Sequence, residues 1–185
     1  MALRADQVRI AITGELSVAP LGTAAPTSSV SSLNAAFVGL GYVNEDGVTK
    51  TPNDVTQAIR AWQNAARVRT VFTEKDWTIN CLLIESKGSV AELYYKGDIA
   101  VVGAGEWSLV PDTVTDGRQA FVLDVIDGSV HERIYIPTGE VTERAEVVYA
   151  NGEPIGRGVT LTCYYNDTIS GPFKIFTDNA AWGYS

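Results

Sequence analysis

The chain has 185 residues, of which 45% are hydrophobic and 19% are charged, and its formal net charge is −8. This length suits one domain with a full core and is short for two, and the composition excludes a disordered chain. The excess of acidic residues excludes tight DNA binding, because nucleic-acid-binding proteins need clustered basic charge.

The first 36 residues combine a strand pattern with a long uncharged loop. Val8, Ile10 and Ile12 alternate with Arg9, Ala11 and Thr13, which predicts a strand with one buried face. No apolar run here has the length of a signal peptide, and none in the chain approaches a membrane span. Residues 19–36 are rich in Ala, Pro, Ser and Thr. A loop of this length either has a role or is disordered.

The next segment, "LGYVNEDGVTKTPND" at residues 40–54, places Asn44-Glu45-Asp46-Gly47 between apolar residues. Carboxylates in such a cluster suit a metal site, whereas Asp and Asn followed by Gly also suit a bend in the chain. Val48 and Thr49 break the spacing of an EF-hand loop. We therefore interpret residues 44–47 as a turn and not as a cation site.

Period-two alternation continues along the rest of the chain and predicts a mainly β fold, a β-sandwich or barrel. The clearest strands are residues 77–83 and 159–165, where apolar side chains alternate with Thr and Asn. Further expected strands are 55–63, 66–73, 99–103, 119–126, 130–136, 144–150 and 172–177. Asp127-Gly128 and Asn151-Gly152 separate consecutive strand patterns, so both are predicted to be hairpin turns.

One short helix is predicted in "SKGSVAELYYKG", over residues 89–96. Ser89 and Glu92 have the spacing of a capping box, in which the two side chains satisfy free amides of the first turn. Val90, Leu93 and Tyr94 fall on one face, and Gly97 suits a left-handed end. Two turns are too short to be stable alone, so the helix is expected to flank the sheet.

Little in the sequence indicates catalysis. His131 is the single histidine, and a nucleophilic arrangement with Ser129 and Asp127 fails because residues two apart on a strand do not place a hydroxyl on an imidazole. The remaining carboxylates are scattered through turns, and the common nucleotide, metal and hydrolase motifs are missing. "GAGEWS" at residues 103–108 lacks the third glycine of a dinucleotide site. We expect no enzyme, no cofactor and no metal ion.

The cysteines and tryptophans are predicted to be structural. Cys81 and Cys163 lie within apolar alternating runs and are interpreted as buried free thiols, with a disulfide between paired strands as the alternative. The tryptophans at 62, 77, 107 and 182 suit core or subunit-interface packing. Exposed aromatic side chains would instead suit a carbohydrate-binding β-sandwich.

The order of these segments resembles the major tail protein (tail tube protein) of long, non-contractile-tailed phages, especially those that infect actinobacteria. The resemblance is carried by "VRIAITGELSVAPLGTAAPTSSVSSLNAAFVGLGYVNEDGVT", followed by "IRAWQNAARVRTVFTEKDWTINCLLIESKGSVAELYY". It covers residues 1–97 well, and "IPTGEV" and "YANGEPIG" extend it more loosely. The order and spacing of the motifs carry the resemblance, because no single motif is diagnostic.

The resemblance implies a single tail-tube domain over residues 1–185, with a flanking helix and long loops. Such subunits form hexameric rings that stack into a tube, the virion conduit through which DNA is ejected without specific binding. Its implied partners are further copies and the tape-measure, tail-tip and terminator proteins, and assembly is expected in the bacterial cytoplasm. The alternatives are a tail-terminator or head–tail joining protein, a secretion-system tube protein, or a carbohydrate-binding module.

Two sets of side chains are candidates for this function. Polar residues of the expected strands are candidates for lining the lumen: Thr56, Arg60, Arg67, Arg69, Asp76, Thr78 and Asn80. The arginines fit poorly with an acidic lumen and suit pairing with acids across a subunit seam. The uncharged loop is a candidate inter-subunit contact through Pro20, Leu21, Gly22, Thr23, Pro26 and Val30. Deletion of residues 22–30 is then expected to give a folded monomer that cannot polymerise.

Overall fold

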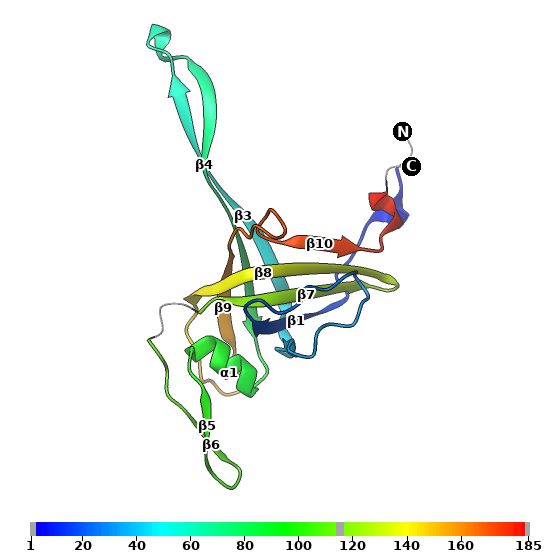
Figure 1. Cartoon of the computed structure of the whole chain (residues 1–185), viewed down its shortest axis with the longest axis vertical. Coiled ribbons are helices and arrows are strands. Elements are labelled where there is room, and N and C mark those ends of the chain that lie inside the picture. Colours follow the sequence, from blue (N-terminus) through cyan, green and yellow to red (C-terminus); the bar gives the residue numbers. More distant parts are fainter. Residues whose placement is uncertain (1–2, 114–116, 184–185) are drawn as a thin grey trace.

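The computed structural model describes residues 3–113 and 117–183 and is built around one large antiparallel sheet (Figure 1). Its strands are β1 (Thr13–Pro20), β2 (Val38–Gly39), β3 (Val43–Arg60), β4 (Arg67–Leu83), β5 (Ile99–Gly103), β6 (Glu106–Leu109), β7 (Gln119–Asp127), β8 (Val130–Arg144), β9 (Arg157–Cys163) and β10 (Lys174–Thr177). The helices of the described residues are α1 (Gly88–Tyr95) and the short 3-10 turns η1 (Ala5–Gln7), η2 (Gln63–Ala65) and η3 (Ala180–Trp182). The predicted mainly β fold with one short α-helix is confirmed.

The large sheet curls toward a barrel. Its strand order is β2-β1-β7-β8-β9-β4-β3, with β10 also paired to β8, while β5 and β6 form a separate hairpin. The two ends of this order are linked by the chain between β2 and β3. The amide of Leu40 donates to the Leu16 carbonyl at 2.8 Å, and the amide of Ile84 donates to the Tyr42 carbonyl at 3.0 Å. Strands from opposite ends of the order therefore share one core.

The concave side of the sheet packs around this core and is closed by α1. Buried side chains come from β1, β4, β7, β8 and β9, and α1 adds Val90, Leu93 and Tyr94. Phe121 is fully buried, and Gly139 lies against its ring so closely that an added Cβ would lie 2.9 Å from it. No helix in the described part of the chain has the length and apolar character needed to cross a bilayer.

Both cysteines are buried in the core as free thiols, as predicted. Cys81 on β4 lies opposite Val159 on β9, and Cys163 lies opposite Trp77, so the two thiols are not a cross-strand pair. Burial raises the pKa of each thiol to about 12. Because the thiolate is the reactive form, we expect both cysteines to react slowly with maleimides near neutral pH.

The first strand begins later in the chain than the sequence pattern predicted. Val8, Ile10 and Ile12 are 72%, 68% and 66% exposed, and β1 begins only at Thr13. The backbone before it is extended and meets the end of β7 at isolated points; the backbone amide of Ile12, for example, donates a hydrogen bond to the Ile126 carbonyl at 3.1 Å. The expectation of a buried face was wrong because no described element of the chain covers these side chains.

The predicted capping box is also wrong. The helix begins at Gly88, so Ser89 lies inside its first turn, where the hydroxyl is buried without a hydrogen-bond partner. The Glu92 carboxylate accepts instead from the backbone amide of Ile99 at 3.2 Å. The left-handed residue at the end is Lys96 (φ 55°) and not Gly97, which is required for a different reason given below.

Two segments that were expected to be turns have a different structure. Residues 44–47 form a bulge inside β3, because the register jumps from Val43 opposite Leu83 to Val48 opposite Cys81. Gly47 accommodates this bulge with φ +69°. β3 is the edge strand of the sheet, so Pro52, which lacks an N–H, does not break it. The expected strand at 144–150 is absent beyond Arg144, and Asn151-Gly152 bends a longer loop that joins β8 to β9.

The long loop between β1 and β2 lies on the convex side of the sheet and is anchored by Arg133. This guanidinium, 7% exposed, binds Asp124 through Nε at 2.6 Å and Nη2 at 3.1 Å. Its Nη1 donates to the carbonyls of Ser28 and Ser31. Leu33 and Phe37 pack beside it on Ala120, Val122 and Tyr135. The loop is therefore held by its own chain.

Candidate functional site

The part of the convex side not covered by the loop is a continuous polar surface, which we call the polar face. It is defined by uncharged hydroxyl and amide side chains on four adjacent strands: Thr49, Thr51 and Asn53 of β3, Thr78 and Asn80 of β4, Thr160 and Thr162 of β9, and Thr142 of β8. All of them are exposed or half-buried, and they alternate with buried residues such as Ile79 and Leu161. Because side chains alternate between the two sides of each strand, one side of the sheet is buried and apolar and the other is polar and solvent-exposed.

Hydrogen bonds between side chains join neighbouring strands across the polar face. Asn53 donates to the Thr78 hydroxyl and Asn80 to the Thr160 hydroxyl, each at 3.0 Å. The hydroxyls of Thr142 and Thr162 lie 2.8 Å apart. By strand register, Asp76 adds negative charge on this side, opposite Asn53, whereas the charge of Glu140, opposite Thr162, is compensated by the Lys96 ammonium at 3.2 Å. Such a surface is hydrated and repels phosphate groups.

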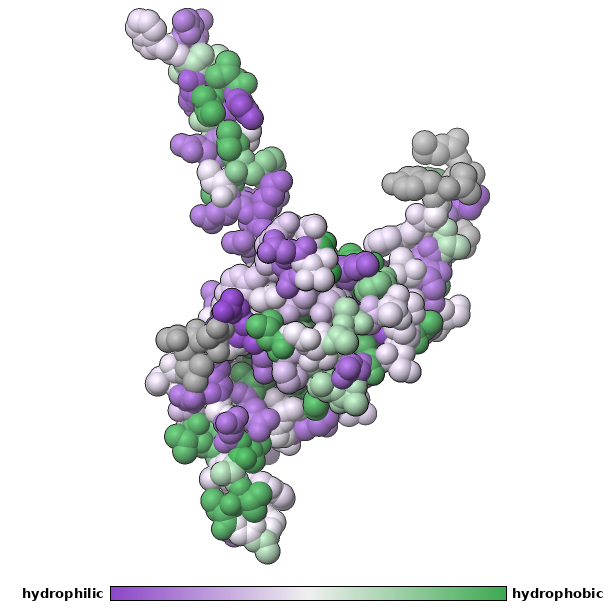
Figure 2. All heavy atoms as spheres, in the orientation of Figure 1, coloured by the Kyte–Doolittle hydropathy of each residue, from purple (hydrophilic) through white to green (hydrophobic). Residues whose placement is uncertain are grey.

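Beyond the body of the protein, β3 and β4 continue as a projecting hairpin (Figure 1). We call residues 55–73 the arm. It starts at a bulge where Val55 pairs with Glu74 but Thr56 pairs with Phe72, and its tip is formed by residues 61–66. Its side chains are exposed or only partly buried, and none belongs to the core. Figure 2 shows that hydrophobic and hydrophilic side chains mix along it.

The structure separates the predicted lumen candidates into two groups. Asp76, Thr78 and Asn80 lie on the polar face, and Arg69, paired with Ile59, continues that side of the hairpin onto the arm. Thr56, Arg60 and Arg67 belong to the other side, because Thr56 pairs with Phe72 and Arg60 with Arg67. A second bulge, between Ile59 and Arg60, places Arg67 and Arg69 on different sides although they are two residues apart.

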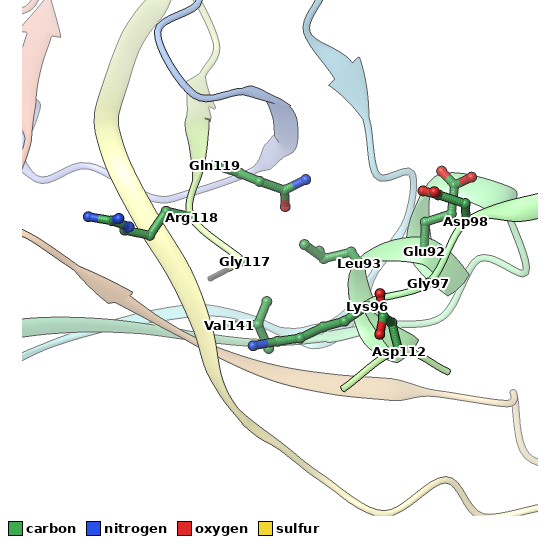
Figure 3. Close-up of a pocket in the computed structure, with 10 residues that line it drawn as sticks. All are labelled: Glu92, Leu93, Lys96, Gly97, Asp98, Asp112, Gly117, Arg118, Gln119 and Val141. Atoms are coloured by element: carbon green, nitrogen blue, oxygen red, sulfur yellow. The ribbon is translucent and has the colours of Figure 1, made fainter. Parts of the chain in front are cut away.

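At the other end of the molecule, β5 and β6 form a second projecting hairpin, whose base packs beside α1. Figure 3 shows this base, where Glu92, Asp98 and Asp112 lie on one side of an open cavity of about 370 Å³ that Lys96 and Arg118 also line. Gly97 is needed here, since an added Cβ would lie 2.1 Å from the Val110 carbonyl oxygen. The Lys96 ammonium on the same wall binds Glu140 at 3.2 Å. Among the described residues that line the cavity, no nucleophile is paired with a base.

The side chains first considered for catalysis have structural partners. His131 does not meet Ser129 or Asp127; its Nδ1 lies 3.0 Å from the Asp178 carboxylate, and its backbone amide donates to the same group at 2.7 Å. These bonds lower the pKa of Asp178 and fasten the segment after β10 to the β7–β8 turn. Within residues 3–113 and 117–183, no group of three His, Cys, Asp or Glu side chains is arranged to hold a metal ion.

The four tryptophans have different positions. Trp77 packs edge-on against Phe173 at 5.1 Å between ring centroids and belongs to the margin of the core. Trp62 at the arm tip, Trp107 on β6 and Trp182 are 96%, 66% and 56% exposed. Large exposed aromatic side chains on projecting elements are typical of protein–protein contacts.

A curled sheet with one polar side and two projecting hairpins defines a structural β-protein, and comparison with known proteins identifies the class. The family model described as "Phage tail tube protein" matches residues 1–183. The chain therefore belongs to the phage tail tube protein family. It is a structural component of the phage tail, and the members of this family are not enzymes.

Two solved structures show weaker similarity. A chain from the structure titled "Virion of native gene transfer agent (GTA) particle" shares 8% identity at a TM-score of 0.40, covering 70% of this chain and 85% of that chain. A chain from the "anti-feeding prophage cap (AFP tube terminating cap)" shares 10% identity at a TM-score of 0.47, covering 96% and 99% respectively. A search of curated protein sequences found no match. The family assignment rests on the family model alone.

Sequence reasoning missed part of the polar face and the anchor of the loop. Thr160 and Thr162 alternate with buried residues in "VTLTC", so their position opposite β4 was detectable once the pairing was known. The role of Arg133 could not be predicted from the sequence, because a single arginine within a strand pattern is usually solvent-exposed. The arm was hidden for a related reason: its alternation matches that of a half-buried strand although both of its sides are exposed.

Proposed function

We propose that this chain forms stacked hexameric rings of a long, non-contractile tail, and that the polar face lines the lumen through which DNA leaves the virion. The observation that carries this proposal is the polar face itself, which spans four adjacent strands and carries hydroxyls, amides and carboxylates. DNA phosphates are repelled by such a wall, so the duplex slides along it. The segment order of residues 1–97 supports a phage of actinobacteria, with assembly in the bacterial cytoplasm.

The dimensions agree with a DNA conduit. Six copies that each contribute β3, β4, β9 and β8 would form a continuous barrel about 48 Å across between backbones, from ~4.8 Å strand spacing and ~40° tilt. After side chains on both walls are subtracted, a duplex still fits. Joining the copies also removes the free edge of β3, which is an aggregation risk in a single subunit.

A cysteine placed on the polar face tests this orientation. Position 51, changed by Thr51→Cys, is exposed and lies on β3, whereas the two native thiols are buried. In assembled tubes we expect the new thiol to react with a small maleimide but not with a maleimide carried on a protein too wide for the lumen. In monomers both reagents should react. Equal labelling of tubes by the wide reagent would place this face outside.

The β1–β2 loop is proposed to contact a neighbouring subunit through its exposed side chains. Of the candidate residues, Pro26 is buried by its own chain and Thr23 is half-buried, whereas Leu21 and Val30 are 51% and 63% exposed. Deleting residues 22–30 removes Ser28, a partner of Arg133, so point variants are the cleaner test.

We expect Leu21→Asp with Val30→Asp to leave the melting temperature of the monomer unchanged and to raise the critical concentration for assembly about tenfold, the effect of ~1.4 kcal/mol. Light scattering against concentration measures it. Thr27→Asp is the control, because this exposed residue adds one charge to the loop without removing apolar surface. Unchanged assembly of the double variant would contradict this contact.

A further inference from the structure

The arm and the β5–β6 hairpin lie at opposite ends of the long axis of the molecule (Figure 1). Neither is covered by its own chain, and contacts between them within one copy are excluded by this separation. Each is a two-stranded ribbon, which is only marginally stable in water by itself. Both ends are therefore suited to be completed by another protein surface.

Both ends expose large apolar side chains. On the hairpin and just after it these are Val101, Val102, Trp107 and Val110, which are 63–77% exposed. On the arm they are Val55, Ile59, Trp62, Val68 and Phe72, of which Trp62 is 96% exposed. Figure 2 shows hydrophobic side chains gathered on the β5–β6 hairpin and interspersed with hydrophilic ones along the arm. Apolar patches of this kind on a soluble protein mark interaction surfaces.

The charges at the two ends are opposite. The arm contains Arg60, Arg67 and Arg69 and no acidic residue, a charge of +3 in a chain whose total is −8. The hairpin segment 98–112 contains Asp98, Glu106 and Asp112 and no basic residue, a charge of −3. Within the described residues, none of these six side chains forms an ion pair.

We propose that the β5–β6 hairpin is the docking surface for the arm of a second copy of this chain, displaced along the long axis. The inference rests on the proposed function, in which copies of the chain assemble into a tube. The contact is heterologous, because different surfaces meet, and its displacement along the long axis lets it repeat from copy to copy without closing on itself. Apolar side chains supply the buried area, and the opposite charges select the partner and its direction.

Reversing the charges at each end separately tests the pairing. Arg67→Glu with Arg69→Glu changes the arm from +3 to −1, and Asp98→Lys with Glu106→Lys changes the hairpin from −3 to +1. We expect each variant alone to raise the critical concentration for assembly at least about tenfold. A one-to-one mixture of the two variants should assemble, since every arm then finds a hairpin of opposite charge. A single chain carrying all four changes should assemble as well.

A matched control separates this pairing from a net-charge effect. Glu153→Lys with Asp167→Lys makes the same charge change as the hairpin variant at exposed positions outside both ends, and its assembly should not change. Loss of assembly in this control, or normal assembly of either reversed variant alone, would overturn the inference. So would the absence of association between the two reversed variants in analytical ultracentrifugation, which detects pairing even without tubes. Failure of the unmodified protein to form tubes would instead contradict the proposed function.

Discussion

A protein in which Asn-Gly replaces residues 55–74 is expected to fold and to lose assembly completely. The replacement joins Asp54 to Lys75, which already face each other across the hairpin, through the dipeptide preferred in two-residue turns. None of the removed side chains belongs to the core, so unfolding of the body should be unchanged. Assembly should fail because the exposed apolar and basic surface of the arm is gone.

Two measurements determine whether this variant folds and whether it assembles. Thermal unfolding by circular dichroism should give the melting temperature of the unmodified monomer to within a few degrees, and sedimentation velocity should show only monomers at concentrations where the parent forms tubes. Gln57→Ala, an exposed and uncharged position on the arm, is the matched control and should assemble. Tubes of normal width from the armless protein would contradict a role for the arm in assembly.

Arg133→Ala is expected to cost about 3 kcal/mol of unfolding free energy, because it breaks a partly buried ion pair and several charge-assisted hydrogen bonds at once. Asp124 would lose both of its guanidinium bonds, and the Ser28 and Ser31 carbonyls would lose their donor. The loop over the convex side should detach with them. Urea denaturation of the monomer measures the loss as a lower midpoint at unchanged slope.

Two further variants distinguish the effect of breaking the ion pair on stability from the effect of simply removing a side chain. Arg133→Met with Asp124→Leu removes both charges and keeps most of the volume, so it should recover most of the lost stability. Lys174→Ala, at an exposed strand position, should change the unfolding free energy by less than ~0.5 kcal/mol. A loss below about 1 kcal/mol for Arg133→Ala would show that this anchor is not important.

Much of the fold was predictable because burial on one side of a sheet leaves a period of two. Ile79, Cys81 and Leu83, and Val159, Leu161 and Cys163, were recognised as core faces and are buried. The β7–β8 hairpin was recognised from Asp127-Gly128, where Gly128 has φ +60°. The helix was found from its apolar face, although its capping was misread, because Ser89 and Glu92 have other neighbours in the tertiary structure.

The rest depended on contacts between copies or between distant segments, which a single sequence does not reveal. Val8, Ile10 and Ile12 have the alternation of a buried strand but are exposed in one copy. The arm has the same alternation, and its projection is evident only in the structure, where β3 and β4 extend past the core. The polar face depends on which strands are neighbours, so Asn80 could be proposed for the lumen from sequence while its partner Thr160 could not.

Cryo-electron microscopy of the purified, concentrated protein would show which side of the sheet faces the lumen. We expect hollow tubes of stacked six-subunit rings in which Thr78, Asn80 and Thr162 face the lumen and the arm of each copy reaches another copy. Tubes in which this polar face forms the outer wall, or closed single rings that do not stack, would contradict it.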